Sequence, residues 1–230
     1  MALQSSKEIV LITGANTGLG FQIARLLLRD HSPRFYVFLA ARTPSKGDAA
    51  VRELHEAGLQ DCEALELDVS SDESIARAVG VVEGKVGRVD VLHVNVSNSA
   101  LSAAVQVGET ADVCCTQAGV APDLHLATGA SLSATMREAF ETNVIGAAAT
   151  AQNFAPLLER SSNPRVIFMS SGQGSLTRVA ASGGKSVKDW PAYSASKAAL
   201  NMVMLWFAGQ WSRWRVNSCA PGYRVSRNLY

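Results

Sequence analysis

The sequence predicts one α/β domain built on a doubly wound parallel sheet, and three observations support this fold class. Apolar runs of strand length alternate with helical patterns along the chain. A glycine-rich turn joins the first expected strand to the first expected helix, and the second expected strand is apolar enough to be buried on both faces. Because the chain has 230 residues, of which 47% are hydrophobic, we expect one large domain over 1–230 in preference to two small ones.

The individual elements follow from local patterns, taken in chain order. The first strand, 9–13, is an apolar run that leads into the glycine-rich turn, and the helix after it, 19–29, offers Phe21 and Leu27 to the sheet. Ser71 can cap a helix over 71–82, because a serine oxygen accepts a hydrogen bond from a free N–H of the first turn. The other expected strands are 35–41, 64–67, 89–94, 165–169 and 215–218, and the other expected helices are 47–57, 136–158 and 192–208.

Composition and charge argue against several classes of function. With a net charge of +1 and scattered basic residues, the chain shows no basic stripe for nucleic acid. Its cysteines lack metal-binding spacing, which predicts a reduced protein without a metal site; they are Cys62, Cys114, Cys115 and Cys219. The N-terminus has no signal-peptide pattern and no apolar stretch is long enough to cross a bilayer. We therefore expect a cytoplasmic protein that acts on a small molecule, without a membrane partner.

The most informative pair of residues is Tyr193 and Lys197. Within a helix, their spacing places both side chains on one face. An ammonium group beside a phenol favours the phenolate and lowers the pKa of the tyrosine from its usual value of about 10. Such a tyrosine can exchange a proton with a carbonyl or alcohol oxygen near neutral pH. The spacing also arises by chance, but together with Ser171 and a nucleotide-binding turn in the same chain it indicates hydride-transfer chemistry.

The sequence TGANTGLG at 13–20 directly follows a strand and opens a helix, which is the context of a dinucleotide phosphate site. Glycines let the backbone approach a pyrophosphate, and the helix N-terminus supplies free N–H groups. The spacing Gly-x-x-x-Gly-x-Gly differs from the usual Gly-x-Gly-x-x-Gly. A plain glycine-rich turn between a strand and a helix is therefore the alternative interpretation.

The end of the second strand indicates which nicotinamide cofactor to expect. An acidic residue at this place binds the ribose 2′-hydroxyl of NAD, whereas a nearby arginine accommodates the 2′-phosphate of NADP. The strand ends in Ala40-Ala41-Arg42, without a carboxylate. We therefore expect NADP(H) as the cofactor and Arg42 as the phosphate partner; a solvated surface arginine is the alternative.

With these motifs, the chain resembles the classical short-chain dehydrogenase/reductase family, and within it the NADP-preferring, fungal-type carbonyl reductases. The matches follow the order of that family over roughly residues 7–224. They are TGANTGLG at 13–20, Asp68-Val69 after the third strand, Asn143 in Asn-Val-Ile-Gly, Ser171 in Met-Ser-Ser-Gly, YSASK at 193–197 and Pro221-Gly222 after the sixth strand. The resemblance implies a Rossmann-type fold and an NADP(H)-dependent conversion between a carbonyl and an alcohol.

The resemblance also implies a role for each matching residue. Tyr193 would act as general acid in carbonyl reduction and as base in alcohol oxidation, and Lys197 would lower its pKa and hold the nicotinamide ribose. Ser171, rather than Ser170, fits the Ser-x-x-Gly pattern and would hydrogen-bond the substrate oxygen. Asn143 would anchor a water that links Lys197 to solvent. Contacts with the cofactor are expected from Gly14, Asn16, Thr17, Gly18, Leu19, Gly20, Arg42, Asp68, Val69, Asn95, Tyr193, Lys197, Pro221 and Gly222.

Further expectations concern the adenine and the assembly. By the same resemblance, Asp68 would hold the adenine amino group, with the Val69 backbone beside it. Family members are commonly homodimers or homotetramers, and we carry this over as an expectation. No motif in the chain names the substrate.

The segment after the fourth expected strand departs from the family pattern. The family continues here into Asn-Asn-Ala-Gly, whereas in this chain Asn95 is separated from the next Ala-Gly pair, Ala118-Gly119. Joining Asn95 directly to Ala118 restores the family register with one substitution, Val94 for the first asparagine. We therefore interpret residues 96–117 as an insertion. It is either a retained intron, since both of its ends can be encoded by splice-site consensus sequences, or a family-specific loop over the cofactor.

The chain is also expected to be truncated relative to the family, after about residue 224. The family pattern continues with a substrate-covering segment, a further helix and a seventh strand, which this sequence does not contain. Without a last strand, the sixth strand would be an exposed edge. Two functional hypotheses follow. The chain is an active NADP-dependent reductase, or it is an impaired or inactive relative, mis-spliced or truncated, with at most a nucleotide-binding or interaction role.

Overall fold

The computed structural model of the chain describes residues 6–95 and 121–222. The expected insertion at 96–117, the Ala118-Gly119 pair and the expected truncation after about 224 lie outside these residues and stay predictions. Within the described ranges, no helix combines the length and the apolar character that a membrane crossing needs.

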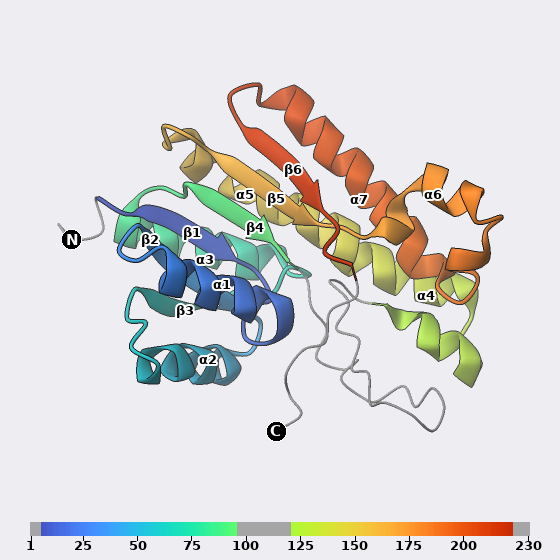
Figure 1. The fold of residues 1–230 in the computed structure, drawn as a ribbon, viewed down its shortest axis with the longest axis horizontal. Coiled ribbons are helices and arrows are strands. Elements are labelled where there is room, and N and C mark those ends of the chain that lie inside the picture. Colours follow the sequence, from blue (N-terminus) through green and yellow to red (C-terminus); the bar gives the residue numbers. More distant parts are fainter. Residues whose placement is uncertain (1–5, 96–120, 223–230) are drawn as a thin grey trace.

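Six parallel strands form one sheet, in the order β3-β2-β1-β4-β5-β6 (Figure 1). The strands are β1 (Glu8–Ile12), β2 (Phe35–Ala41), β3 (Cys62–Glu66), β4 (Val91–Val94), β5 (Arg165–Met169) and β6 (Arg215–Cys219). The register sets Ile12 of β1 level with Leu39 of β2 on one side and with His93 of β4 on the other. Because the strand order runs outward from β1 in both directions, the predicted doubly wound sheet is confirmed.

Helices cover both faces of this sheet. They are α1 (Gly18–Asp30), α2 (Pro44–Glu56), α3 (Asp72–Val86), α4 (Leu132–Phe140), α5 (Ala147–Glu159), α6 (Leu176–Ala181) and α7 (Pro191–Gln210), with short helical turns η2 (Pro122–Thr128), η3 (Glu141–Gly146), η4 (Gly172–Gly174) and η5 (Lys185–Val187). Leu28 of α1 and Leu54 of α2 belong to the core on one face. Ile75 of α3, Phe154 of α5 and Phe207 of α7 belong to the core on the other face, so α1 and α2 lie opposite α3, α5 and α7 (Figure 1).

Local sequence determines where α3 begins and ends. Ser71 caps this helix as predicted, since its Oγ accepts a hydrogen bond from the Ser74 N–H at 3.2 Å. At the other end, Gly87 takes the left-handed conformation with φ of 73°, which glycine adopts without steric penalty. The expectation of a helix over 71–82 is therefore confirmed, although α3 continues to Val86.

The long helix expected over 136–158 is longer than predicted and is interrupted. α4 begins after Ser131, whose Oγ accepts a hydrogen bond from the Ala134 N–H at 3.2 Å. The π-helical turn η3 then joins α4 to α5. At the end of η3, a Cβ on Gly146 would come within 2.5 Å of the Val69 carbonyl oxygen. Glycine thus permits a close approach to the segment after β3, and a single π turn changes the helical period too locally to be seen in the sequence pattern.

β6 forms one edge of the described sheet. It pairs with β5 from Arg165 opposite Arg215 to Met169 opposite Cys219. Every residue of β6 except Val216 is exposed, whereas β5 is mostly buried. Among the described residues, β6 is therefore the less covered of the two edge strands, β3 being the other.

His93 is a buried polar residue in the middle of the sheet. In the register it lies between Ile12 of β1 and Ile167 of β5, and it is 5% exposed. Its Nδ1 atom has no hydrogen-bond partner among the described residues. Burial lowers the pKa of the imidazole from 6.5 to about 4, because the charged form loses its hydration. His93 is therefore neutral at pH 7, and its protonation opposes folding in acid.

We expect the substitution His93→Leu to reduce the loss of stability in mild acid. In the wild-type protein the unfolded chain takes up a proton near pH 6.5 and the folded chain only near pH 4, so the free energy of unfolding falls as the pH falls through this window. Without the imidazole, this fall should be smaller by about 1–3 kcal/mol, since one unit of pKa corresponds to about 1.4 kcal/mol. Urea unfolding at pH 7 and near pH 4.5 measures the difference, with His31→Leu at an exposed site as the control. Equal acid sensitivity of wild type and His93→Leu would contradict this interpretation.

Candidate active site

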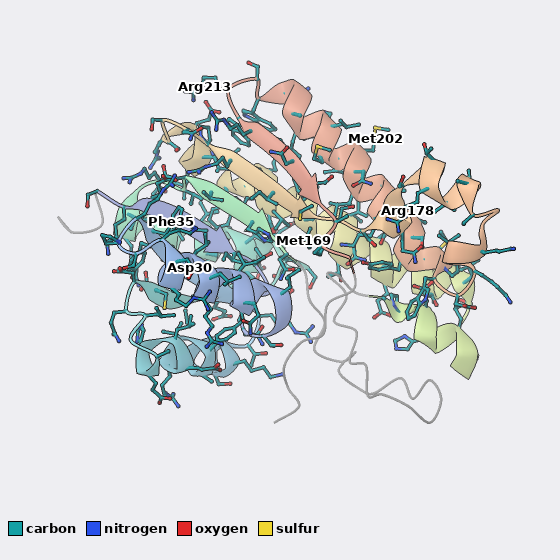
Figure 2. The ribbon with its side chains drawn as sticks, viewed as in Figure 1. Asp30, Phe35, Met169, Arg178, Met202 and Arg213 are labelled. Atoms are coloured by element: carbon teal, nitrogen blue, oxygen red, sulfur yellow. The ribbon has the colours of Figure 1, made fainter. Side chains whose placement is uncertain are left out.

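The expected site residues gather at the carboxyl edge of the sheet. Because the strands are parallel, their carboxyl ends meet at this edge, and the crevice where the strand order reverses is the usual ligand site of such sheets. That reversal lies between β1 and β4. Figure 2 labels Met169, the last residue of β5, near the middle of the molecule at this edge. The residues that follow the strands are 13–20 after β1, Arg42 after β2, Asp68 and Val69 after β3, Asn95 after β4, Ser171 after β5, and Pro221 and Gly222 after β6.

The glycine-rich turn after β1 has a backbone that favours glycine at three positions. Gly14 and Gly18 have φ values of 58° and 60°, in the left-handed region. Gly20 lies in the first turn of α1, where a Cβ would come within 2.7 Å of Asn95 Nδ2 and within 2.8 Å of the Gly14 carbonyl oxygen. The first two glycines therefore shape the turn, and the third allows close packing of α1 on the end of β4.

Asn95 holds this turn against β4. Its main-chain N–H donates to Thr13 Oγ1 at 2.9 Å, and the Thr13 hydroxyl donates to the Asn95 carbonyl oxygen at 2.7 Å. The side-chain Nδ2 of Asn95 donates to the carbonyl oxygens of Thr13 and Gly14, each at 3.2 Å. Thr13 and Asn95 are both completely buried. These bonds join β1 and β4 at the place where the strand order reverses.

The turn and the start of α1 fit the diphosphate of a dinucleotide. The first N–H groups of a helix have no acceptor within the helix, and the side chain of Thr17 does not cap α1. The N-terminus of α1 can therefore bind an anion through its free N–H groups. Asn16, Thr17 and Leu19 are half-buried beside it, so each of them keeps surface for a ligand.

Arg42 and Asp68 lie beyond the ends of β2 and β3, on the side of the sheet where an adenosine is expected. Arg42 is exposed and makes no ion pair within the described residues. Asp68 Oδ1 accepts hydrogen bonds from the Ser70 N–H at 3.0 Å and from the Ser70 hydroxyl at 2.6 Å. This contact orients the carboxylate and leaves its second oxygen to a donor from outside.

Tyr193 and Lys197 form a buried pair on α7. The two side chains lie on one face of the helix, with Lys197 Nζ 5.6 Å from the centroid of the Tyr193 ring. Tyr193 is 3% exposed and Lys197 is 1% exposed. Lys197 Nζ donates a hydrogen bond to the Met169 carbonyl oxygen at 2.7 Å, which ties α7 to the end of β5. Burial lowers the pKa of the Lys197 amine from 10.5 to about 7, because its ammonium form loses hydration.

Asn143 reaches the same helix through Ser196. Asn143 lies in the π turn η3 and is completely buried, and its Nδ2 donates to Ser196 Oγ at 2.9 Å. The Ser196 hydroxyl in turn donates to the main-chain carbonyl oxygen of Tyr193 at 2.7 Å. The structure therefore brings Asn143 next to the Tyr193–Lys197 pair, with Ser196 as the link to the main chain of Tyr193.

The two serines after β5 have different surroundings. Ser170 is buried, and its hydroxyl donates to Asn201 Oδ1 at 2.6 Å. Ser171 is half-buried, and its Oγ accepts a hydrogen bond from the Gln173 N–H at 3.2 Å at the start of η4. The Ser170 hydroxyl thus donates its hydrogen bond inside the protein, to Asn201. Ser171 is the one of the two that keeps exposed surface, as the expectation of Ser171 rather than Ser170 requires.

Gly174 lets the Ser171 turn lie directly on α7. A Cβ at this position would come within 2.7 Å of the Lys197 carbonyl carbon and within 2.9 Å of the Ala198 nitrogen. Asn201 adds a second link, since its Nδ2 donates to the Gly174 carbonyl oxygen at 3.3 Å. The glycine of the Ser-x-x-Gly pattern therefore holds Ser171 close to the helix that carries Tyr193.

The expected residues that the described hydrogen bonds link form two groups, one around the glycine-rich turn and one on and beside α7. Ser171 and Asn143 are linked to α7, which carries Tyr193 and Lys197, and Asn95 is linked to Gly14. No described hydrogen bond or ion pair joins Arg42, Asp68 or the Pro221-Gly222 pair to either group. Sequence reasoning missed four residues that hold these groups together, namely Thr13, Asp123, Ser196 and Asn201. Within the described residues, no cluster of His, Cys, Asp and Glu side chains is arranged to hold a metal ion.

Comparison with known proteins identifies the family. A family model described as short chain dehydrogenase matches residues 8–228. The short-chain dehydrogenase/reductase ATR10 of Stachybotrys chlorohalonatus is 42% identical over 221 residues, which cover 96% of this chain and 72% of that protein. The short-chain dehydrogenase/reductase tropE of Talaromyces stipitatus is 35% identical over 220 residues, which cover 87% of this chain and 71% of that protein.

Solved structures agree with this family at the level of the fold. RhlG of Pseudomonas aeruginosa, described as an active-site complex with NADP, aligns with a TM-score of 0.71 and 26% identity over 99% of this chain and 77% of that chain. Salutaridine reductase from Papaver somniferum aligns with a TM-score of 0.71 and 21% identity over 94% of this chain and 86% of that chain, a likeness of fold alone. By its sequence and its fold, this chain belongs to the classical short-chain dehydrogenase/reductase family, whose members are oxidoreductases that use nicotinamide cofactors.

Proposed function

We propose that this chain is an NADP(H)-dependent oxidoreductase that interconverts a carbonyl and an alcohol, with Tyr193 as general acid and base. The observation that carries the proposal is the buried Tyr193–Lys197 pair at the carboxyl edge of the sheet, next to the Ser171 turn. A phenol and an amine held together there suit proton transfer to a substrate oxygen. The nicotinamide ring of a bound cofactor would supply or accept the hydride.

Tyr193, Ser171 and Lys197 would each have a different role at the substrate oxygen. In reduction, Tyr193 donates its phenolic proton to the carbonyl oxygen, and in oxidation it takes the proton of the alcohol. Ser171, which keeps exposed surface on its turn, donates a hydrogen bond to the same oxygen and orients it. Lys197 in its charged form stabilises the phenolate of Tyr193. Because burial lowers the pKa of Lys197 to about 7, this charge is only partly present at neutral pH in the ligand-free protein.

The cofactor-binding half of the proposal rests on the backbone after β1 and on Arg42. The glycine-rich turn and the free N–H groups of α1 would hold the diphosphate. Arg42 is exposed at the end of β2 and would meet the 2′-phosphate of NADP(H). The similarity to RhlG, whose structure is described as a complex with NADP, supports the same cofactor.

A second candidate is a relative of the same fold that binds nucleotide but does not turn over substrate. The departure of the sequence from the family pattern at 96–117 favours it, because this segment follows Asn95 at the expected cofactor site. Activity decides between the two candidates, and NADPH binding alone does not. The first experiment therefore measures both on the same protein.

We expect Tyr193→Phe to lose turnover while it keeps cofactor binding. Loss of the phenolic proton removes the general acid, which is worth about 10²- to 10⁴-fold in rate. Reduction of a panel of ketones and aldehydes, followed by NADPH oxidation, measures turnover, and the NADPH-induced shift in melting temperature measures binding. Tyr36→Phe on β2 provides the control, because it removes the same hydroxyl away from the site. Activity retained by Tyr193→Phe would contradict the assignment, and a wild-type protein that binds NADPH without turnover would favour the second candidate.

We expect Arg42→Asp to shift the preference from NADPH toward NADH. An arginine–phosphate hydrogen bond with charge on both partners is worth roughly 1.5–3 kcal/mol, so the ratio of the NADPH and NADH dissociation constants should change by about 10- to 100-fold. Titration with each cofactor measures this ratio. Arg52→Asp on the exposed side of α2 makes the same change of charge away from the expected phosphate. If both variants leave the ratio unchanged, Arg42 is a solvated surface residue.

A further inference from the structure

We propose that Asp123 is a positioning residue for the reaction, because its carboxylate holds the main chain of Tyr193 in place. This inference rests on the proposed function of Tyr193 as general acid and base. Asp123 lies in η2, which is distant in the sequence from α7. Its Oδ1 accepts a hydrogen bond from the Ala192 N–H at 2.7 Å, and its Oδ2 accepts one from the Tyr193 N–H at 2.9 Å.

Asp123 caps α7 from outside that helix. The residue before α7, Trp190, makes no side-chain cap, and the N–H groups of Ala192 and Tyr193 belong to the first turn, where a helix has no acceptor of its own. A carboxylate is well suited to this place, since the N-terminal end of a helix carries a partial positive charge. Hydrogen bonds that involve a charged acceptor are also stronger than bonds between neutral groups.

The burial of Asp123 shows that these bonds are its main role in the folded protein. The residue is 4% exposed, and both carboxylate oxygens are used by α7. A carboxylate removed from water in this way is tolerated only when it is paired or hydrogen-bonded. A surface aspartate close to the same helix end offers a comparison, because Asp189 is exposed and makes no described bond to α7.

The main chain of Tyr193 is held on both sides. Asp123 accepts from its N–H, and the Ser196 hydroxyl, itself bonded to Asn143, donates to its carbonyl oxygen. The phenol can therefore reach only the positions that its own side-chain torsions allow. Since Lys197 is fixed separately by the Met169 carbonyl oxygen, the spacing between phenol and amine depends on the Tyr193 main chain.

The described hydrogen bonds of Asp123 are all with α7, the catalytic half of the proposed site. Hydride and proton transfer both require that the cofactor and the Tyr193 phenol lie at the correct positions around the substrate. A misplacement of about 1 Å can lower the rate by about 10²-fold. We therefore infer that Asp123 affects the rate of the chemical step more than it affects binding of the cofactor.

The test compares Asp123→Asn with Asp189→Asn in this chain. The amide of asparagine keeps the size of the side chain but turns an N–H toward one of the two main-chain donors, whereas Asp189→Asn removes the same charge without breaking a bond to α7. For Asp123→Asn we expect kcat to fall by about tenfold or more and the NADPH dissociation constant to stay within about threefold. Asp123→Glu restores a carboxylate and should recover part of the lost rate.

Hydrogen exchange of individual amides provides a readout that does not depend on activity. In Asp123→Asn the amides of Ala192 and Tyr193 should exchange about tenfold faster, with the amides of the β-strands unchanged, because a lost cap loosens only the first turn. Unchanged exchange and unchanged kcat in Asp123→Asn would overturn the proposal. An equal fall of kcat in Asp189→Asn would also overturn it, because charge alone would then explain the effect. If wild type reduces no carbonyl compound, the function proposed for Tyr193 fails, and the exchange rates still decide whether Asp123 holds α7.

Discussion

The set of hydrogen bonds between Thr13 and Asn95 is the constraint on which the rest of the site depends. Four bonds between these two residues and Gly14 join β1 to β4 at the place where the strand order reverses, and both residues are completely buried. A parallel sheet offers a ligand crevice there because the following loops diverge to opposite faces. Were these bonds absent, buried backbone groups at the centre of the sheet would be left unpaired, which is costly in free energy. The same bonds fix where the glycine-rich turn begins.

The proposed catalytic half of the site is arranged around the buried amine of Lys197. Lys197 would be expensive to bury as an ammonium group, and the protein offers it one carbonyl oxygen, that of Met169, as an acceptor within the described residues. The lowered pKa of Lys197 is the consequence, and it makes the charge next to Tyr193 sensitive to anything that binds nearby. An anionic cofactor close to this amine would raise its pKa again. In this way the binding of the proposed cofactor would change the charge beside Tyr193 without any movement of the fold.

The sequence predicted the fold well where hydrophobic pattern and secondary structure coincide. The bounds expected for β2 and β5 are those of the structure, because both strands are apolar runs with clear polar ends. The π turn η3 and the start of α4 were not predicted, since a local change of helical period and a serine cap leave little trace in the pattern of apolar residues. The Tyr193–Lys197 pair was predicted from its spacing, and Asn143 and Ser171 were predicted from the resemblance to the family. Their supports, Asp123, Ser196 and Asn201, were not, because each acts through a contact that only the folded chain creates.

The two halves of the proposed site use different parts of the chain, and this difference determines how each tolerates substitution. On the side of β1, glycines and free N–H groups would bind the proposed cofactor. Binding there would depend on the backbone conformation, and a Cβ at Gly20 has no room. On the side of α7, the proposed reacting groups are side chains, and neighbours such as Asp123 at the Tyr193 N–H would fix their positions by holding the main chain. A substitution on the first side should therefore act on affinity for the cofactor. On the second side, a substitution of a supporting residue should act on the rate while binding persists, which separates the two halves even before the substrate is known.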